Sequence, residues 1–148
     1  MRLVDTSAWI EWLIASPVGT IVAREVPERG AWLVPTIVQL ERAQWLRRDA
    51  GEDNADQVIA FTATCIVAAL DTGIALRAAD PCATHRLATA DAIVLAAAMA
   101  HGADLLTCDR HLKGLRVCGR MPVSRRNRPK RRAFPTGVLS RVGLLCTL

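Results

Sequence analysis

Short apolar runs alternate with longer stretches of helical spacing along the first 119 residues of the chain. The short runs predict strands, because each is apolar or β-branched and is bounded by turn or cap residues. The predicted strands are residues 3–4, 31–36, 65–70, 103–109 and 115–119. The predicted helices between them are residues 7–13, 17–26, 37–51, 53–64, 73–85 and 92–102. Alternating strands and helices favour an α/β fold, with a mostly parallel sheet of about five strands between helices.

Residues at the strand ends predict how several helices begin and which faces they bury. Thr6 or Ser7 is expected to cap the first helix, Thr36 the third and Asp71 the fifth, so Asp71 is interpreted as structural. Ser16-Pro17 opens the second helix. Trp9 and Trp12 share a face with Ile10 and Leu13, which favours packing over base stacking. In the third helix the predicted apolar stripe is Ile37, Leu40, Ala43 and Leu46.

The charge of the chain divides it into two parts. Residues 1–119 hold 11 basic and 14 acidic residues, whereas residues 120–148 hold 8 basic and no acidic ones. At 148 residues the chain has room for one ordinary domain. We therefore expect a folded domain at residues 1–123 and a basic appendage at residues 124–148, partly disordered, which either binds nucleic acid through its charge or is a solvated run.

Nothing in the sequence indicates export or a membrane span. Asp5 and Glu11 interrupt the apolar character of the first residues, so these do not resemble a secretory signal. The longest apolar runs, such as residues 92–100, fall well short of the ~20 residues that a bilayer requires. Five cysteines without a CxxC pair fit reduced thiols. We expect a cytoplasmic protein that does not bind membranes.

Four carboxylates recur where a predicted strand ends or a predicted helix begins. They are Asp5, Glu41, Asp91 and Asp109. In an open α/β sheet this edge is the usual ligand site, and Mg²⁺ prefers converging oxygen ligands. Four neighbouring carboxylates repel one another unless a divalent cation offsets their charge, and such a cation activates water for attack on a phosphoryl group. The competing interpretation is that these acids are helix caps and solvated charges.

Two other chemistries deserve comparison with this interpretation. Cys82-x2-His85 and Cys108-x2-His111 contain residue types that bind zinc, but neither spacing matches a common zinc motif. We interpret these residues as buried thiols and surface imidazoles, and His101 as a residue at a helix C-terminus. A phosphatase with Asp5 as nucleophile would need a second Asp two residues later, where Ser7 stands.

The flanking residues of the four acids resemble those of PIN-domain ribonucleases, and among them the VapC toxins of bacterial toxin–antitoxin pairs. The matching segments are VDTSAWIEW, PTIVQLERAQ, LATADAIVLAAAMAHGADLLTCDRHLKGL and the closing LRV. Together they cover roughly residues 1–119 in register and leave the basic tail unmatched. Cys108 departs from the family pattern, since that position is rarely a thiol, but no predicted ligand depends on it.

The resemblance implies a three-layer α/β/α sandwich and metal-dependent endonucleolytic cleavage of RNA. It implies that Asp5, Asp91 and Asp109 bind Mg²⁺ or Mn²⁺ and that Glu41 completes the acidic catalytic site. Thr6, Ser7 and Thr107 are neighbours able to position a water or a phosphate oxygen. The implied partners are an RNA substrate, a cognate antitoxin and a second copy of the chain. The alternative is a catalytically inactive PIN-like module that binds antitoxin or nucleic acid.

Overall fold

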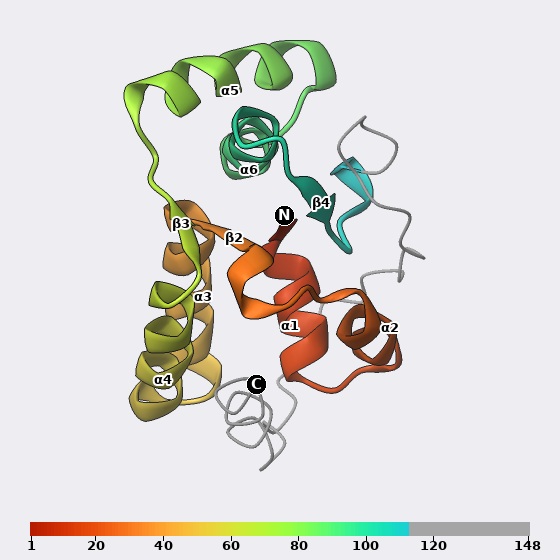
Figure 1. The fold of residues 1–148 in the computed structure, drawn as a ribbon, viewed down its shortest axis with the longest axis vertical. Coiled ribbons are helices and arrows are strands. Elements are labelled where there is room, and N and C mark those ends of the chain that lie inside the picture. The colour runs from red at the N-terminus through yellow and green to blue at the C-terminus, as the bar shows by residue number, and fades with distance from the viewer. Residues whose placement is uncertain (113–148) are drawn as a thin grey trace.

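The computed structural model describes residues 1–112, and these form helices and strands in nearly strict alternation (Figure 1). The strands are β1 (Arg2–Val4), β2 (Trp32–Pro35), β3 (Ile66–Ala68) and β4 (Asp104–Leu106). The helices are α1 (Thr6–Leu13), α2 (Pro17–Glu25), α3 (Thr36–Asp49), α4 (Glu52–Ala63), α5 (Thr72–His85) and α6 (Thr89–Ala100), with short 3-10 helices η1 (Arg29–Ala31) and η2 (Arg110–Leu112). No helix of this described part is long and apolar enough to cross a membrane.

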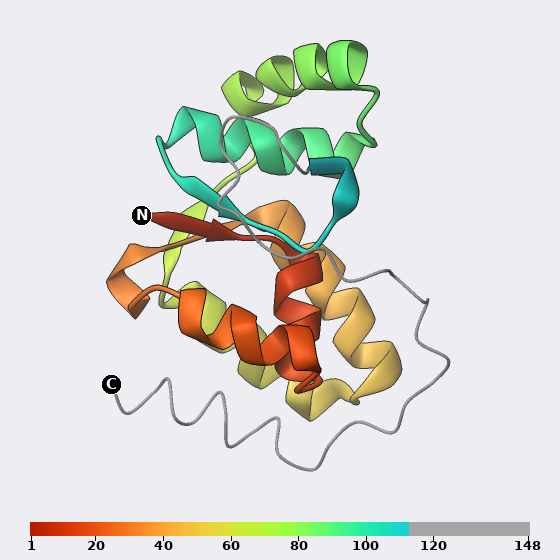
Figure 2. The same cartoon turned by 90° about the vertical axis from the view of Figure 1, so that its right-hand side faces the viewer.

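The four strands form one parallel sheet in the order β3-β2-β1-β4. Strand β1 lies inside the sheet, where Leu3 pairs with Leu33 on one side and with Leu105 on the other. The side view places β1 and β4 next to each other with their ends at the same edge (Figure 2). These strands confirm the predicted parallel sheet. The predicted fifth strand at 115–119 and the appendage at 124–148 lie outside the described residues.

Helices cover both faces of the sheet, which confirms the predicted three-layer arrangement. Helices α5 and α6 pack together on one face, and α1 to α4 lie on the other (Figures 1 and 2). The second face contains an aromatic cluster in which Trp9 meets Trp32 edge to face, with ring centroids 4.5 Å apart, and Trp32 meets Phe61 at 5.3 Å. Trp9 and Trp12 are 0% and 7% exposed, so their predicted packing role is confirmed.

Two of the predicted helix caps are wrong by one or two residues. Helix α1 is capped by Asp5, whose extended backbone lets its carboxylate accept a hydrogen bond from the Ser7 amide. Helix α3 begins at Thr36, and its hydroxyl accepts a hydrogen bond from the Leu70 amide. The predictions for Ser16 and Asp71 are confirmed, and Asp71 accepts a hydrogen bond of 2.7 Å from the Ile74 amide.

The predicted core stripe of α3 is confirmed at Leu46 and wrong at Leu40, while Ile37 and Ala43 are partly buried. The buried residues of this helix are Val38, Arg42 and Leu46, whereas Leu40 is 52% exposed. Arg42 occupies a core position because its guanidinium lies over the Trp9 ring, 3.8 Å from the ring centroid, and its Nε donates to the Val38 carbonyl at 3.4 Å. Val38, Arg42 and Leu46 therefore form the buried face at i, i+4 spacing. A search for apolar residues overlooks this face because its middle member is charged.

Gly19 allows α2 to lie directly on α1. A Cβ atom at this position would lie 2.0 Å from the Glu11 carbonyl oxygen and 3.0 Å from the Trp12 Cα. The same junction is held by Ser16, whose hydroxyl donates to the Glu11 carboxylate and accepts from the Gly19 amide at 2.8 Å. The obstacle is backbone, so the two helices must separate to admit any side chain.

We expect Gly19→Ala to lower the free energy of unfolding by about 3 kcal/mol, the upper end of the usual cost of overpacking. Urea unfolding followed by circular dichroism measures the change. Gly30→Ala is the matched control, because nothing lies within 4 Å of a Cβ at that position. Equal stability of the two variants would contradict the close approach of α1 and α2.

Candidate active site

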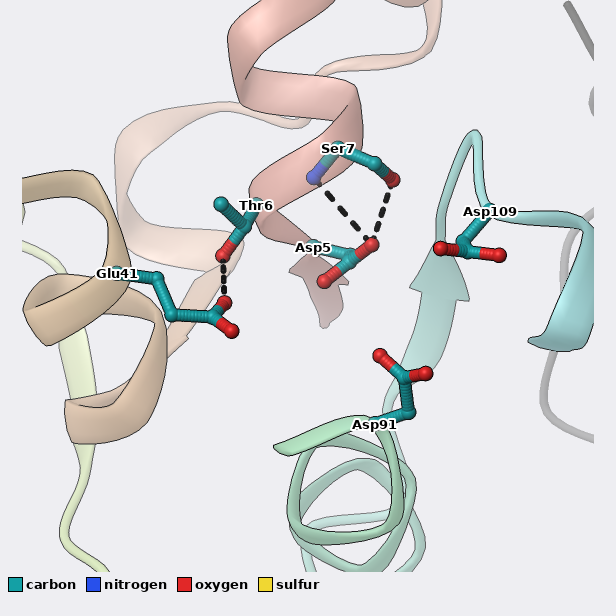
Figure 3. A pocket seen from close by; sticks show the side chains of 6 residues that line it. All are labelled: Asp5, Thr6, Ser7, Glu41, Asp91 and Asp109. Atoms are coloured by element: carbon teal, nitrogen blue, oxygen red, sulfur yellow. Dashed lines mark hydrogen bonds between the residues drawn. The ribbon is translucent and has the colours of Figure 1, made fainter. Parts of the chain in front are cut away.

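The four acids predicted from the sequence line one pocket of about 110 Å³ at the edge of the sheet (Figure 3). Asp5 follows the last residue of β1, and Asp109 follows β4 by three residues. Asp91 lies in the first turn of α6, and Glu41 lies in the second turn of α3. Thr6 and Ser7 complete the lining. Strand ends and helix starts thus bring together residues that are more than 100 positions apart in the sequence.

Asp5 is held more firmly than any other acid of the pocket for which contacts are described. Its Oδ2 accepts hydrogen bonds from the Ser7 hydroxyl at 2.6 Å, the Thr107 hydroxyl at 2.8 Å and the Ser7 amide at 3.4 Å. All of these contacts end on Oδ2, while Oδ1 points into the pocket (Figure 3). The residue is only 5% exposed. One oxygen of Asp5 therefore anchors the strand ends, and the other faces the pocket.

Ser7 and Thr107 fasten the end of β4 to the start of α1. The Cys108 amide donates to the Ser7 hydroxyl at 2.9 Å, and the Asp109 amide donates to the Thr107 hydroxyl at the same distance. The Asp5 amide donates to the Leu106 carbonyl at 2.9 Å, which continues the β1 and β4 pairing. These hydroxyl groups were expected to position a water or a phosphate oxygen, but in the structure they contact the carboxylates and backbone that build the pocket.

Glu41 and Thr6 form a separate pair on another side of the pocket. The Thr6 hydroxyl donates to Glu41 Oε2 at 2.6 Å, which turns the Glu41 carboxylate toward the cavity (Figure 3). Because Thr6 is the first residue of α1 and Glu41 belongs to α3, the contact also ties these helices together. Thr6 therefore orients one acid as Ser7 and Thr107 orient another.

Asp91 has a raised pKa, because it is partly desolvated and lies near the negative charges of the other acids. Its pKa is raised to about 6, first by desolvation and then by the negative charges of Asp5, Asp109 and Glu41, while His111 opposes the shift. Asp91 and Asp109 point toward the same space (Figure 3). A carboxyl group that resists ionisation beside three other acids is expected where a cation normally supplies the missing charge.

The donor set fits a hard divalent cation. Carboxylate oxygens are the ligands that Mg²⁺ and Mn²⁺ prefer, and hydroxyl groups lie behind them. Within residues 1–112, the group with ligand atoms close enough to share a metal ion is Asp91, Asp109 and His111, whose donor atoms lie within 4.8 Å of one another. No cysteine belongs to this group, so within residues 1–112 neither Cys-x2-His pair forms a metal-binding group as a unit.

Arg42 was not identified from the sequence as a neighbour of the site. It is fully buried, and its pKa is lowered to about 9 by desolvation, while the charges of Cys65 and Asp5 act in the opposite direction. Its Nη1 and Nη2 have no hydrogen-bond partner within the described part of the chain. A positive charge behind Asp5 reduces the repulsion among the acids. The only available signal was its position next to Glu41 in the helix.

The sequence of residues 2–117 matches the PIN domain family. The chain belongs to the PIN-domain family. The comparison with curated proteins found no match to this chain. The fold assignment rests on this match together with solved structures of the same architecture.

Similar solved structures include a toxin–antitoxin complex from Klebsiella pneumoniae, with a TM-score of 0.69 and 19% identity over 81% of this chain and 97% of the other. The VapC20 toxin of Mycobacterium tuberculosis, described as cleaving the sarcin–ricin loop, has a TM-score of 0.61 and 18% identity over 74% and 90%. DNA-bound VapBC from Salmonella typhimurium has a TM-score of 0.60 and 14% identity over 83% and 95%. At these identities the likeness shows a shared fold alone, and the family assignment rests on the match over residues 2–117.

The raised pKa of Asp91 predicts how pH affects the metal-free protein. Between the ordinary pKa of 3.8 and the raised value of about 6, the folded protein retains a proton that the unfolded chain releases, so stability falls as pH rises through this range. Asp91→Asn imitates the protonated acid. Melting curves in chelator should show the variant gaining stability over wild type from pH 4 to pH 7.

Asp80→Asn is the control for this experiment, because Asp80 is an exposed acid on α5 outside the pocket. The difference in melting temperature between Asp80→Asn and wild type should not increase from pH 4 to pH 7. A difference between Asp91→Asn and wild type that stays constant across this range would contradict the crowding of charge around Asp91.

Proposed function

We propose that the chain is a metal-dependent endoribonuclease that acts as the toxin of a toxin–antitoxin pair. The observation that carries this proposal is the pocket in which Asp5, Glu41, Asp91 and Asp109 converge. Membership of the PIN-domain family supports it, as do similar structures described as toxins or toxin–antitoxin complexes. Four acids without a cation would repel the phosphate groups of RNA. The negative charge of the pocket therefore attracts a metal ion and also makes that ion necessary for RNA to bind.

In this proposal Asp5, Asp91 and Asp109 hold Mg²⁺ or Mn²⁺, and Glu41 completes the acidic site. A bound divalent ion supplies a water of lowered pKa and neutralises charge that builds on a phosphoryl oxygen. Asp5 presents Oδ1 while Ser7 and Thr107 fix its Oδ2. Thr6 keeps the Glu41 carboxylate turned inward, where it can accept a proton from a water approaching the phosphate.

The proposed partners follow from the charge of the pocket and from the resemblance to VapC toxins. A cognate antitoxin that inserts an Arg or Lys side chain would neutralise the acids and block access of RNA. Similar structures that contain an antitoxin or bound DNA support an antitoxin partner. We further propose a homodimer and a cytoplasmic location, where an RNA substrate is available.

The mechanism predicts that Asp5→Asn and Asp91→Asn abolish cleavage of a mixed RNA pool, with a loss of at least about 100-fold, because each removes a charge that the cation needs. Glu41→Gln should be similarly or slightly less damaging. The assay is performed with Mg²⁺ or Mn²⁺, with and without chelator, and circular dichroism verifies folding.

Asp80→Asn is again the matched control and should cleave like wild type, because it removes an exposed carboxylate outside the pocket. Wild-type activity in Asp5→Asn, or full activity in chelator, would contradict the metal-carboxylate mechanism. If wild type binds metal and antitoxin but leaves every RNA intact, the chain is the inactive binding module instead.

The proposed domain boundary near residue 123 can be tested by truncation. The family match ends at residue 117, and all acids of the pocket precede it. Removal of residues 124–148 should leave the thermal transition almost unchanged while weakening any salt-dependent affinity for RNA, since this segment has 7 of the chain's basic residues. Loss of the folded domain on truncation would place the boundary further along the chain.

A further inference from the structure

His111 lies at the rim of the acidic pocket and contacts one of its acids. Its backbone amide donates to Asp109 Oδ1 at 2.9 Å, and its ring Nδ1 lies 3.4 Å from the same oxygen. An imidazole nitrogen of His111 and one carboxylate oxygen from each of Asp91 and Asp109 lie within 4.8 Å of one another. From the sequence, His111 was interpreted as an ordinary surface imidazole, and its position beside Asp91 and Asp109 was not predicted.

The local structure holds His111 in this position without burying it. His111 is the middle residue of η2, and the next residue, Leu112, is 0% exposed and fixes the short helix to the core. The His111 side chain is 60% exposed, whereas that of Asp109 is 14% exposed. The imidazole can therefore turn toward the two acids at small cost in packing, while the backbone keeps it beside Asp109.

A second observation supports a cation in this pocket and concerns the carboxylate of Asp5. Asp5 is 95% buried, its Oδ2 accepts three hydrogen bonds, and its Oδ1 points into the pocket (Figure 3). A carboxylate oxygen that faces a polar pocket, on an acid whose other oxygen is already bound, is suited to bind a cation there. Asp5 follows the strand that pairs with β4, and its carboxylate lines the same pocket as that of Asp109 (Figure 3).

We propose that His111 is a metal ligand of this pocket, together with Asp91 and Asp109, and that its nitrogen makes the pocket select a transition-metal ion over Mg²⁺. This inference rests on the metal site of the proposed function and extends it to the identity of the ion. Mg²⁺ binds almost exclusively through oxygen and keeps much of its water, whereas an imidazole nitrogen is a preferred ligand of first-row transition metals. Affinity should therefore rise from Mn²⁺ to Co²⁺ and Ni²⁺.

The test measures metal binding directly, without RNA. Untagged full-length protein is titrated with CoCl₂ at pH 8, where an ordinary imidazole is neutral, and Co²⁺ binding is followed by visible absorption and calorimetry. MgCl₂ is titrated in the same way. His111→Ala should weaken Co²⁺ binding by at least ~10-fold, since even groups that only support a metal ligand contribute that much, and should change Mg²⁺ binding little.

His101→Ala is the matched control. His101 follows the last residue of α6, whereas Asp91 lies in the first turn of the same 12-residue helix, so roughly 15 Å separate them. The chain has three histidines, and ¹⁵N-histidine labelling gives one set of imidazole signals for each. Co²⁺ should produce a large contact shift in the imidazole of His111, and none in that of His85 or His101.

Equal Co²⁺ affinity in wild type and His111→Ala, with no contact shift at His111, would overturn the inference and leave a site of carboxylates alone. Asp91→Asn separates this outcome from failure of the proposed function. If Asp91→Asn loses Co²⁺ and Mg²⁺ while His111→Ala retains both, the acidic metal site stands without His111. If wild type binds Co²⁺ through His111 but cleaves no RNA, the ligand assignment stands and the ribonuclease proposal fails.

Discussion

Repulsion among four carboxylates is the constraint around which this domain is built. Parallel strands end at a common edge, so the residues that follow β1 and β4 meet there whatever their charge. The chain opposes the repulsion in two ways: three hydrogen bonds reach one oxygen of Asp5, and the buried Arg42 places a positive charge behind it. Asp91 receives no comparable support from the described contacts, and its pKa is raised by desolvation first and then by the charges of the other acids.

The elements of the fold and the members of the pocket follow from the sequence because both depend on local patterns. Short apolar runs identified β1 to β4, and an acid near the end of a strand or the start of a helix identified Asp5, Glu41, Asp91 and Asp109. The position of each acid relative to its element is a local property, whereas the convergence of the acids follows from the rule that parallel strands share an edge.

The parts that could not be predicted depend on contacts between distant residues. Asp5 rather than Thr6 or Ser7 caps α1, since hydrogen bonds from Thr107 and Ser7 fix its carboxylate beside the first turn. Arg42 is buried because Trp9, on another helix, offers its ring face. The position of His111 beside Asp109 depends on the path of η2 after β4. For Arg42 the residue type alone favours an exposed position, whereas for Asp5 and His111 the local sequence does not identify the distant partner.

The pairing of β1 with β4 links the first residues of the chain to residues about 100 positions later. During synthesis on the ribosome, Asp5 emerges first and Asp109 among the last residues of the described part, so the pocket cannot exist until nearly the whole domain has been made. Contacts of such long sequence separation also form late in folding, because closing a long loop costs entropy before the strands can pair. The acidic site is therefore assembled only after Asp109 has left the ribosome and β1 has paired with β4.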